Sequence, residues 1–173
     1  MAFGWLPSAL LVGVLPLICG EVRHTPAMPP VTRVLVTKSA RTLELYSGDR
    51  VVLSYAVAVG KGGAGPKRRA GDLVTPVGHY HVVRHAPSHL HIFLELDYPN
   101  AEDRARFDRL KASGDLPKSA TIGNDIGIHG PPPDQHPFKK ASYQSHGCVV
   151  LEKSEIDVIA ALVADGTDVD IVD

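Results

Sequence analysis

One thiol and two imidazoles lie close together near the end of the chain. His129-Gly130 is followed fifteen residues later by Ser145-His146-Gly147-Cys148. A cysteine thiolate attacks carbonyl carbons readily near neutral pH, and histidine is the usual base that generates it. Gly147 lacks a Cβ, so backbone at that position can approach a substrate closely. This segment therefore predicts acyl transfer through a thioester on Cys148.

The chain contains two cysteines, Cys19 and Cys148, and only the second lies in a segment with catalytic character. Cys19 belongs to an apolar N-terminal stretch that is typical of a removable leader. Without that leader, Cys148 has no intramolecular disulfide partner. An unpaired cysteine in an exported protein is best explained by reactivity or by intermolecular pairing. A buried cysteine that acts as a small apolar side chain is the alternative, but the Ser-His-Gly-Cys context favours a nucleophile.

Two histidines compete for the role of the base. His146 belongs to the same turn as Cys148, whereas His129 comes from a separate stretch of chain and can approach the sulfur from across the site. A base must lie within hydrogen-bonding reach of the proton that it takes. We therefore assign His129 as the proton acceptor and donor. Ser145 and His146 are assigned to shaping the loop through hydrogen bonds.

Tyr80 and Lys67 are further candidates for contact with substrate. Tyr80 lies in a predicted strand, and Lys67 lies with Arg68 and Arg69 in a Gly-rich basic loop. The alternative for the tyrosine is packing, and the alternative for the lysine is a solvated side chain. Both alternatives stay open at this point.

The segments that must position these residues are mostly β. Strands are predicted where β-branched residues cluster or where apolar and polar residues alternate. A turn at Ser47-Gly48-Asp49 joins two of them into a hairpin, and residues 60–71 form a long Gly-rich loop. The predicted strands span residues 31–37, 42–46, 51–59, 77–83, 91–96 and 168–172. The fold class is therefore α+β, mostly β, with one or two short helices.

Two short helices are predicted between these strands. Asn100 caps the first helix, which ends at Gly114 and turns Phe107 and Leu110 inward. Ser154 caps the second helix, which ends at Gly166. The apolar stripe of the second helix consists of Ile156, Ile159, Ala160 and Val163.

The N-terminus has the pattern of an export signal. Residues 6–18 form an apolar run in which Ser8 is the only polar side chain, and a membrane span needs roughly 20 residues. No Lys or Arg precedes the run, so an uncleaved membrane anchor is the alternative. We predict a signal peptide or anchor at 1–20, a Pro-rich linker at 21–30, and a single catalytic domain at 31–173.

Overall charge and histidine spacing exclude some functions. The formal net charge is −1, which gives no case for nucleic-acid binding. His79 and His81 share one strand face, as do His89 and His91, and two histidines at i and i+2 can ligate zinc. No accompanying carboxylate or cysteine spacing completes such a site. The sequence therefore predicts neither a metal nor a cofactor.

Three separated motifs resemble the L,D-transpeptidase catalytic domain, the YkuD-like family. The first is the His129-Gly130 and Ser145-His146-Gly147-Cys148 pair described above. The other two are Gly65-Pro66-Lys67 with Gly71-Asp72-Leu73-Val74-Thr75-Pro76-Val77-Gly78-His79-Tyr80, and Asp97-Tyr98-Pro99-Asn100 with Asp103, which resembles the YafK-like branch. The resemblance covers roughly residues 31–172 and implies a β-sandwich catalytic domain.

The resemblance implies an enzyme of the periplasm or cell envelope that acts on peptidoglycan stem peptides. In this family a cysteine attacks the carbonyl of the third stem residue and expels the terminal D-alanine. Carried onto this sequence, Cys148 is the nucleophile and His129 transfers protons. The Gly130 carbonyl orients the imidazole, and the backbone N–H groups of Gly147 and Cys148 stabilise the oxyanion.

Alternatives remain for the acyl acceptor, for the N-terminal segment and for the class of function. The acyl group passes to an amine, which makes a cross-link or attaches an envelope protein, or to water in hydrolytic relatives. The N-terminal segment contacts the membrane only if it stays uncleaved. The hypothesis from a different class is a catalytically silent wall-binding module, in which Cys148 would be a slow, ordinary thiol.

Overall fold

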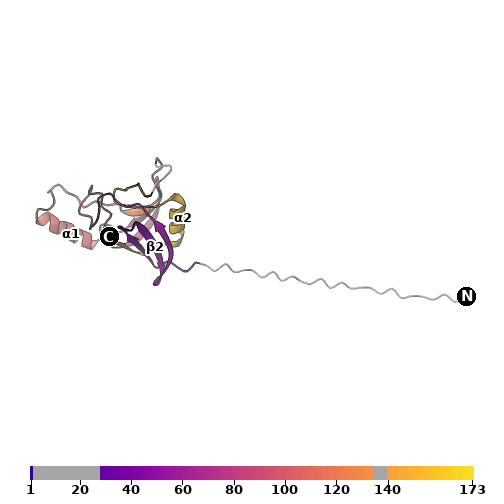
Figure 1. Ribbon diagram of the computed structural model, residues 1–173. Coiled ribbons are helices and arrows are strands. Elements are labelled where there is room, and N and C mark those ends of the chain that lie inside the picture. Colours follow the sequence, from indigo (N-terminus) through magenta and orange to yellow (C-terminus); the bar gives the residue numbers. More distant parts are fainter. Residues whose placement is uncertain (2–27, 135–139) are drawn as a thin grey trace.

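The computed structural model describes residue 1, residues 28–134 and residues 140–173. The predicted signal peptide or anchor (1–20) and most of the predicted linker (21–30) lie outside these residues, apart from residue 1 and residues 28–30. In the described part of the chain, no helix is both long enough and apolar enough to cross a membrane. Figure 1 shows a body of strands with helices α1 and α2 at opposite ends.

The body of the domain consists of eight strands. They are β1 (Arg33–Thr37), β2 (Thr42–Ser47), β3 (Arg50–Ala56), β4 (Gly78–Ser88), β5 (His91–Leu96), β6 (Gly127–His129), β7 (Val149–Val150) and β8 (Asp168–Val172). The six predicted strands correspond to β1–β5 and β8. The sequence analysis missed β6 and β7 as strands, because two or three residues are too few to display an alternating pattern.

The strands form one sheet in the order β3-β2-β1-β8-β4-β5-β6-β7. Neighbours are antiparallel except for β1 with β8 and β6 with β7. Strand β4 pairs with β8 through its first residues and with β5 through its last, and its register with β5 shifts between Val82 and Arg84. A bridge between Ala58 and Val150 connects the two ends of this order. The sheet is therefore bent into two halves that face each other.

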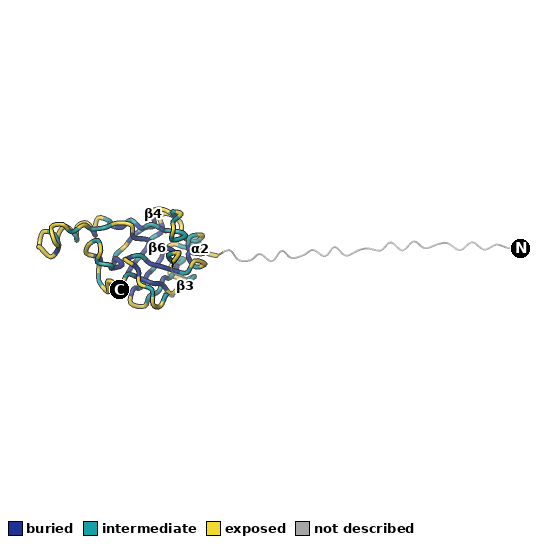
Figure 2. Tube along the Cα trace, turned by 90° about the horizontal axis from the view of Figure 1, so that it is seen from above, coloured by how far each residue is buried: buried dark blue, intermediate teal, exposed yellow. Residues whose placement is uncertain are grey.

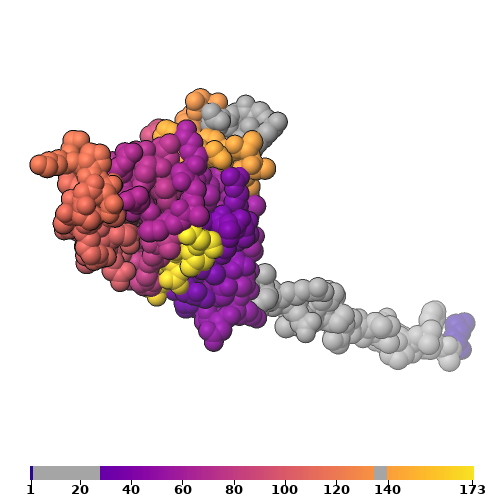
Figure 3. Space-filling view, turned by 60° about the vertical axis from the view of Figure 1, so that its left-hand side comes forward, coloured from indigo at the N-terminus to yellow at the C-terminus, as the bar shows by residue number. Residues whose placement is uncertain are grey.

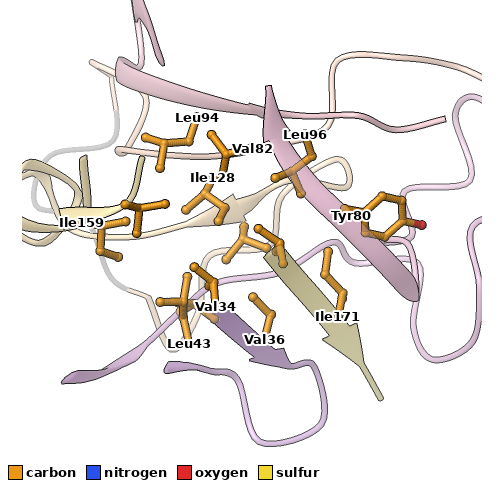
Figure 4. Packing of buried hydrophobic residues seen from close by; sticks show 14 of the residues in the cluster. Val34, Val36, Leu43, Tyr80, Val82, Leu94, Leu96, Ile128, Ile159 and Ile171 are labelled. Atoms are coloured by element: carbon orange, nitrogen blue, oxygen red, sulfur yellow. The ribbon is translucent and has the colours of Figure 1, made fainter. Parts of the chain in front are cut away.

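The hydrophobic core lies between the two halves. Val34 of β1 and Ile171 of β8 are at most 1% exposed, and so are Leu94 of β5 and Ile128 of β6. Figure 4 shows these side chains converging from the two halves, and Figure 2 shows buried backbone concentrated in the middle of the domain. Burial of each such side chain contributes about 1.5–3 kcal/mol. The mostly-β α+β class with two helices is confirmed.

Helix α1 (Ala101–Ala112) begins where the sequence predicts. The Asn100 side-chain oxygen accepts first-turn N–H groups, and the Asn100 backbone N–H donates to the Asp103 carboxylate, so a capping box is complete. The expected inward residues are wrong, because Phe107 and Leu110 are only half-buried and Asp103 is the buried residue. This helix packs through its first turn rather than through an apolar stripe.

Helix α2 (Lys153–Leu162) packs against the core through Ile156 and Ile159, which are fully buried. The predicted cap at Ser154 is wrong. The helix already includes Lys153, and Glu152 is the residue that precedes it, with its backbone N–H donating to the Glu155 carboxylate at 3.0 Å. The acidic side chain at the third position thus satisfies the helix start.

The C-terminal residue anchors the long Gly-rich loop. Lys38 Nζ lies 2.6 Å from the Asp173 carboxylate, and the same carboxylate accepts the Gly65 N–H at 2.8 Å. Figure 3 shows the C-terminal residues, in yellow, set among segments from the first half of the chain. The loop at 60–71 is therefore held at its middle, although its composition indicates flexibility.

Candidate active site

Strand register places the candidate nucleophile beside the candidate base. Strands β6 and β7 are parallel and pair His129 with Val150, so Cys148 lies opposite Gly127. The Gly127 backbone N–H acts to lower the pKa of the Cys148 thiol, in agreement with that alignment. Because successive side chains on a strand point to opposite faces, Cys148 and His129 project from the same face. They are diagonal neighbours on adjacent strands.

The turn before Cys148 is packed against protein backbone. A Cβ on Gly60 would lie 2.2 Å from the Leu73 carbonyl oxygen and 3.1 Å from the Gly147 Cα. Gly147 itself has a φ of +140°, and a Cβ there would lie 3.1 Å from the Val74 carbonyl oxygen. The sequence predicted that backbone at Gly147 approaches a substrate, but the close approach in the structure is to segment 73–75 of the same chain. Only glycine fits the small space and adopts this dihedral angle.

Ser145 holds this turn together. It is buried, its hydroxyl donates to the Cys148 carbonyl, and it accepts the Gly147 N–H at 3.1 Å. The sequence analysis assigned it this kind of loop-shaping role. The predicted oxyanion role of Gly147 conflicts with the last bond, because its N–H is already engaged. Of the two backbone donors predicted for the oxyanion, this leaves the Cys148 N–H.

The Cys148 thiol lies at the wall of a pocket of about 230 Å³, between the 67–71 loop and the 123–126 segment. The residue is partly exposed, and its Sγ lies 3.5 Å from the Asp125 carbonyl oxygen. Removal of water around the sulfur raises the pKa of Cys148 to about 11, which the Gly127 N–H and the Lys67 ammonium only partly oppose. The thiol is therefore protonated at neutral pH.

His129 is buried, with only 5% of the residue exposed. Its Nδ1 lies 2.6 Å from the Gly130 carbonyl oxygen, the orienting contact that the resemblance implies, and its ring stacks on Phe93. Burial lowers the pKa of His129 below the ordinary 6.5, against the opposing effect of the Gly130 bond. The imidazole is therefore neutral at neutral pH, with Nδ1 as the donor and Nε2 free to accept a proton.

The thiol and the imidazole do not share a hydrogen bond within the described residues, since Sγ contacts the Asp125 carbonyl. Catalytic hydrogen bonds are often long in unliganded proteins and shorten when substrate binds. His146, in contrast, is exposed and lines the pocket beside Cys148. The structure thus gives one buried imidazole on the strand adjacent to Cys148 and one exposed imidazole at the pocket.

Lys67 is buried rather than solvated. The residue is 5% exposed, and its Nζ lies 2.6 Å from the Asp72 carboxylate and 3.4 Å from the Val74 carbonyl oxygen. Burial alone would raise the pKa of Asp72, but Lys67 and the backbone N–H groups of Arg68, Arg69 and Val74 together lower it. This ion pair holds the loop at one wall of the pocket. The alternative of a solvated lysine is wrong.

Tyr80 does not belong to the pocket. It is fully buried, and its hydroxyl donates to the Asp103 carboxylate at 3.2 Å, which Arg106 also contacts. Burial, followed by the neighbouring carboxylate, raises the pKa of Tyr80 above its ordinary value. The prediction of substrate contact by Tyr80 is wrong, and the packing alternative holds. The same contact explains why Asp103 is the buried residue of α1.

Sequence reasoning missed three contributors to the site. Asp125 has a φ of +57°, which turns its carbonyl toward the sulfur. A Cβ on Gly127 would lie 2.5 Å from the Leu94 carbonyl oxygen, so glycine is required where β5 and β6 approach. The glycine before Ile-His was a usable signal. Nothing in the sequence marked Asp125 or the ring of Phe93.

A mostly-β domain that presents a partly exposed thiol beside a buried neutral imidazole is typical of cysteine-dependent acyl transfer. Comparison with known protein families identifies the family to which the domain belongs. Residues 31–171 match the YkuD family, the L,D-transpeptidase catalytic domain. The chain belongs to this family, and the resemblance in its motifs is confirmed.

Solved structures and a curated relative share this similarity. The helical cell shape determining protein Pgp2 from Campylobacter jejuni aligns with a TM-score of 0.61 and 26% identity over 83% of this chain and 48% of its own. Bd1075 from Bdellovibrio bacteriovorus, at 23% identity and a TM-score of 0.54 over 83% of this chain and 48% of its own, shares the fold. The Escherichia coli K12 protein named "Putative L,D-transpeptidase YafK" is 38% identical over 79 residues.

These relatives are longer than the chain described here. The match to the Escherichia coli protein covers 42% of this chain and 32% of that protein. The chain spans just under half of the two solved relatives. The similarity therefore covers the catalytic domain and only part of each relative.

Proposed function

We propose that this domain is an exported cysteine acyltransferase that acts on peptidoglycan stem peptides through a thioester on Cys148. Membership of the L,D-transpeptidase family supports the reaction class. The apolar N-terminal stretch supports export. The observation that carries the proposal is the position of Cys148, partly exposed in a pocket and on the same strand face as the neutral His129.

The resting site holds an uncharged pair. The thiol has a pKa raised to about 11, and burial lowers the pKa of His129. A thiolate–imidazolium pair is therefore not the ground state at neutral pH. His129 instead acts as a general base at the moment of attack, when bound substrate brings the sulfur and Nε2 together.

The proposed reaction has two halves. The Cys148 sulfur bonds to the carbonyl carbon of the third stem residue, and the thiol proton passes to His129 Nε2. The bond to the terminal D-alanine then breaks, and the leaving amino group takes that proton from the imidazole. In the second half an amine attacks the thioester and passes a proton through His129 to the departing sulfur, which regenerates the thiol. The Cys148 N–H is the proposed oxyanion donor.

The acceptor decides the product. An amine on a neighbouring stem makes a cross-link, an amine on an envelope protein attaches that protein, and water releases a shortened stem. All three outcomes use the same residues. We favour an amine because cross-linking or attachment is the reaction for which the family is named, and we retain hydrolysis as the alternative.

Mass spectrometry of purified muropeptides tests the proposal. Stem peptides that end in D-alanine are incubated with the wild type, with Cys148→Ala and with buffer alone. Release of D-alanine by the wild type alone supports the proposal, and dimers distinguish an amine acceptor from shortened monomers produced by water. Absence of any product with the folded wild type, with and without an added amine, supports the silent wall-binding module instead.

Alkylation rate does not separate these hypotheses. A thiol with a pKa near 11 is almost entirely protonated at neutral pH, so an active enzyme also alkylates slowly. A strained carbonyl electrophile is a better probe because it depends on general-base attack. We expect a carbapenem to add covalently to the Cys148 peptide of the wild type, and intact-mass measurement should find no adduct on Cys148→Ala.

A further inference from the structure

A second group of chemically competent side chains lies on the outer face of the sheet. His79 and His81 project from β4 and Asp168 projects from β8, and the register pairs His81 directly with Asp168. The three side chains are 54%, 44% and 49% exposed. None of them lines the pocket around Cys148. The group is therefore separate from the candidate active site.

The distances within this group are those of ligands around one ion. The Nε2 atoms of His79 and His81 lie 3.7 and 3.4 Å from Oδ1 of Asp168. One ligand atom from each residue lies within 4.8 Å of the others. Around tetrahedral zinc with bonds of about 2.0–2.1 Å, ligand atoms are about 3.3 Å apart. Small side-chain rotations would bring all three atoms to bonding distance of one ion.

Each imidazole is also held by its other ring nitrogen. Nδ1 of His79 lies 2.8 Å from Asp170, and Nδ1 of His81 lies 3.0 Å from Asp97. Asp97 in turn accepts the His81 backbone N–H at 2.9 Å, and Arg33 contacts Asp170 at 3.4 Å. Histidine ligands of metals almost always donate their second N–H in this way, because the contact fixes the tautomer and aims the free lone pair.

We propose that His79, His81 and Asp168 bind a divalent transition-metal ion, with zinc as the best fit. Two imidazoles and a carboxylate are ligands that zinc accepts, and the exposed face leaves a fourth position for water. Asp97 and Asp170 orient the two imidazoles, and the carboxylates balance the charge of the ion. Bound metal would tie β4 to β8 in the middle of the sheet order.

Zinc titration of the untagged full chain tests the site. The parent protein carries Cys19→Ala and Cys148→Ala, so that neither thiol of the chain can bind the ion, and affinity is measured by competition with a chromophoric chelator. We expect one ion per chain in the parent and an affinity at least about tenfold weaker in His79→Gln and in His81→Gln. Asp97→Asn and Asp170→Asn should each weaken binding about tenfold, because they remove the contacts that orient the ligands.

A matched control is available on the same strand, β4. His85 lies 2.6 Å from Asp165, so it forms an imidazole–carboxylate pair outside the proposed ligand group. His85→Gln should leave zinc affinity unchanged. Equal affinity in the parent and in the His79→Gln/His81→Gln double variant, including no binding in either, would overturn the proposal. A loss in His85→Gln as large as that in His81→Gln would overturn it as well.

Thermal unfolding supplies a readout that does not depend on catalysis. Ligands that bind only the folded state raise the melting temperature. Excess zinc should raise the melting temperature of the parent and of His85→Gln, and leave that of His81→Gln unchanged. Melting without zinc shows whether each variant is folded. An equal zinc-induced rise in parent and His81→Gln would place the ion elsewhere and reject the site.

Discussion

His129 and His79 are the same side chain in opposite surroundings. His129 is 5% exposed and its Nδ1 contacts a neutral carbonyl, and burial lowers its pKa. The side chain of His79 is 54% exposed, and its contact with the Asp170 carboxylate raises its pKa. Loss of water disfavours the charged imidazole, whereas a nearby carboxylate favours it. Only the first environment produces a neutral base, and only the second supplies carboxylates to orient a metal ligand.

The same contrast holds for the two regions as a whole. The pocket around Cys148 is built from closely packed backbone, with Lys67 and Asp72 as a largely buried ion pair. The outer face of β4 and β8 is built from half-exposed charged side chains. We therefore expect single substitutions to cost more stability in the pocket than on the outer face.

The largest expected effect comes from the thiol of the pocket. Cys148→Ser keeps the size of the side chain but replaces the nucleophile with a hydroxyl that does not ionise near neutral pH. We expect D-alanine release from muropeptides to fall about a thousandfold or more. Circular dichroism should show an unchanged fold. Wild-type turnover in this variant would exclude the thioester mechanism.

The next largest effect is expected from the two imidazoles near the thiol, whose variants are compared for activity. His129→Ala should lower kcat/KM by about 10²–10⁴, because it removes the general base. His146→Ala is the matched control, since His146 is exposed at the pocket and should cost less. The same D-alanine assay measures both variants. If the His146 variant loses more activity, the two roles must be exchanged.

A stability measurement compares the buried ion pair of the pocket with an exposed ion pair elsewhere on the domain. Asp72→Ala leaves the Lys67 ammonium, whose side chain is 4% exposed, without its carboxylate and should cost about 3 kcal/mol in urea unfolding. Asp165→Ala removes an exposed partner of His85 and should change stability by no more than about 0.5 kcal/mol. Adding Lys67→Met to Asp72→Ala should recover part of the loss. No recovery would show that the buried charge is not the cause.

The smallest effect is a shift in pH dependence. The mechanism needs neutral His129, and burial lowers the pKa of that imidazole below 6.5. Activity should therefore fall only as the pH drops through this lowered pKa, so the acidic midpoint of kcat/KM lies below 6.5. His85→Gln, which changes an imidazole outside the pocket, should leave the midpoint in place. A midpoint above 6.5 in the wild type would contradict the assignment of a buried neutral base.

Much of the local structure was predictable from particular residues. Strict alternation predicted the β2–β3 hairpin, and Asn100 predicted the start of α1 because its side chain can accept first-turn N–H groups. Alternation could not show which face of a strand is enclosed. Tyr80 therefore remained a candidate for substrate contact until the structure placed it against Asp103.

The sequence by itself determined which reactive groups are available: a thiol in the Ser-His-Gly-Cys turn, a histidine sixteen residues before that turn, and six of the eight strands along the chain. Tertiary structure alone decided which groups meet and which lose water. It engaged the Gly147 N–H with Ser145, buried Lys67 against Asp72, and brought Asp168 beside His81. These contacts form when strands pair in the sheet or when loops fold back on themselves. Side-chain type and local spacing do not reveal them, and the pKa of each group follows from its surroundings.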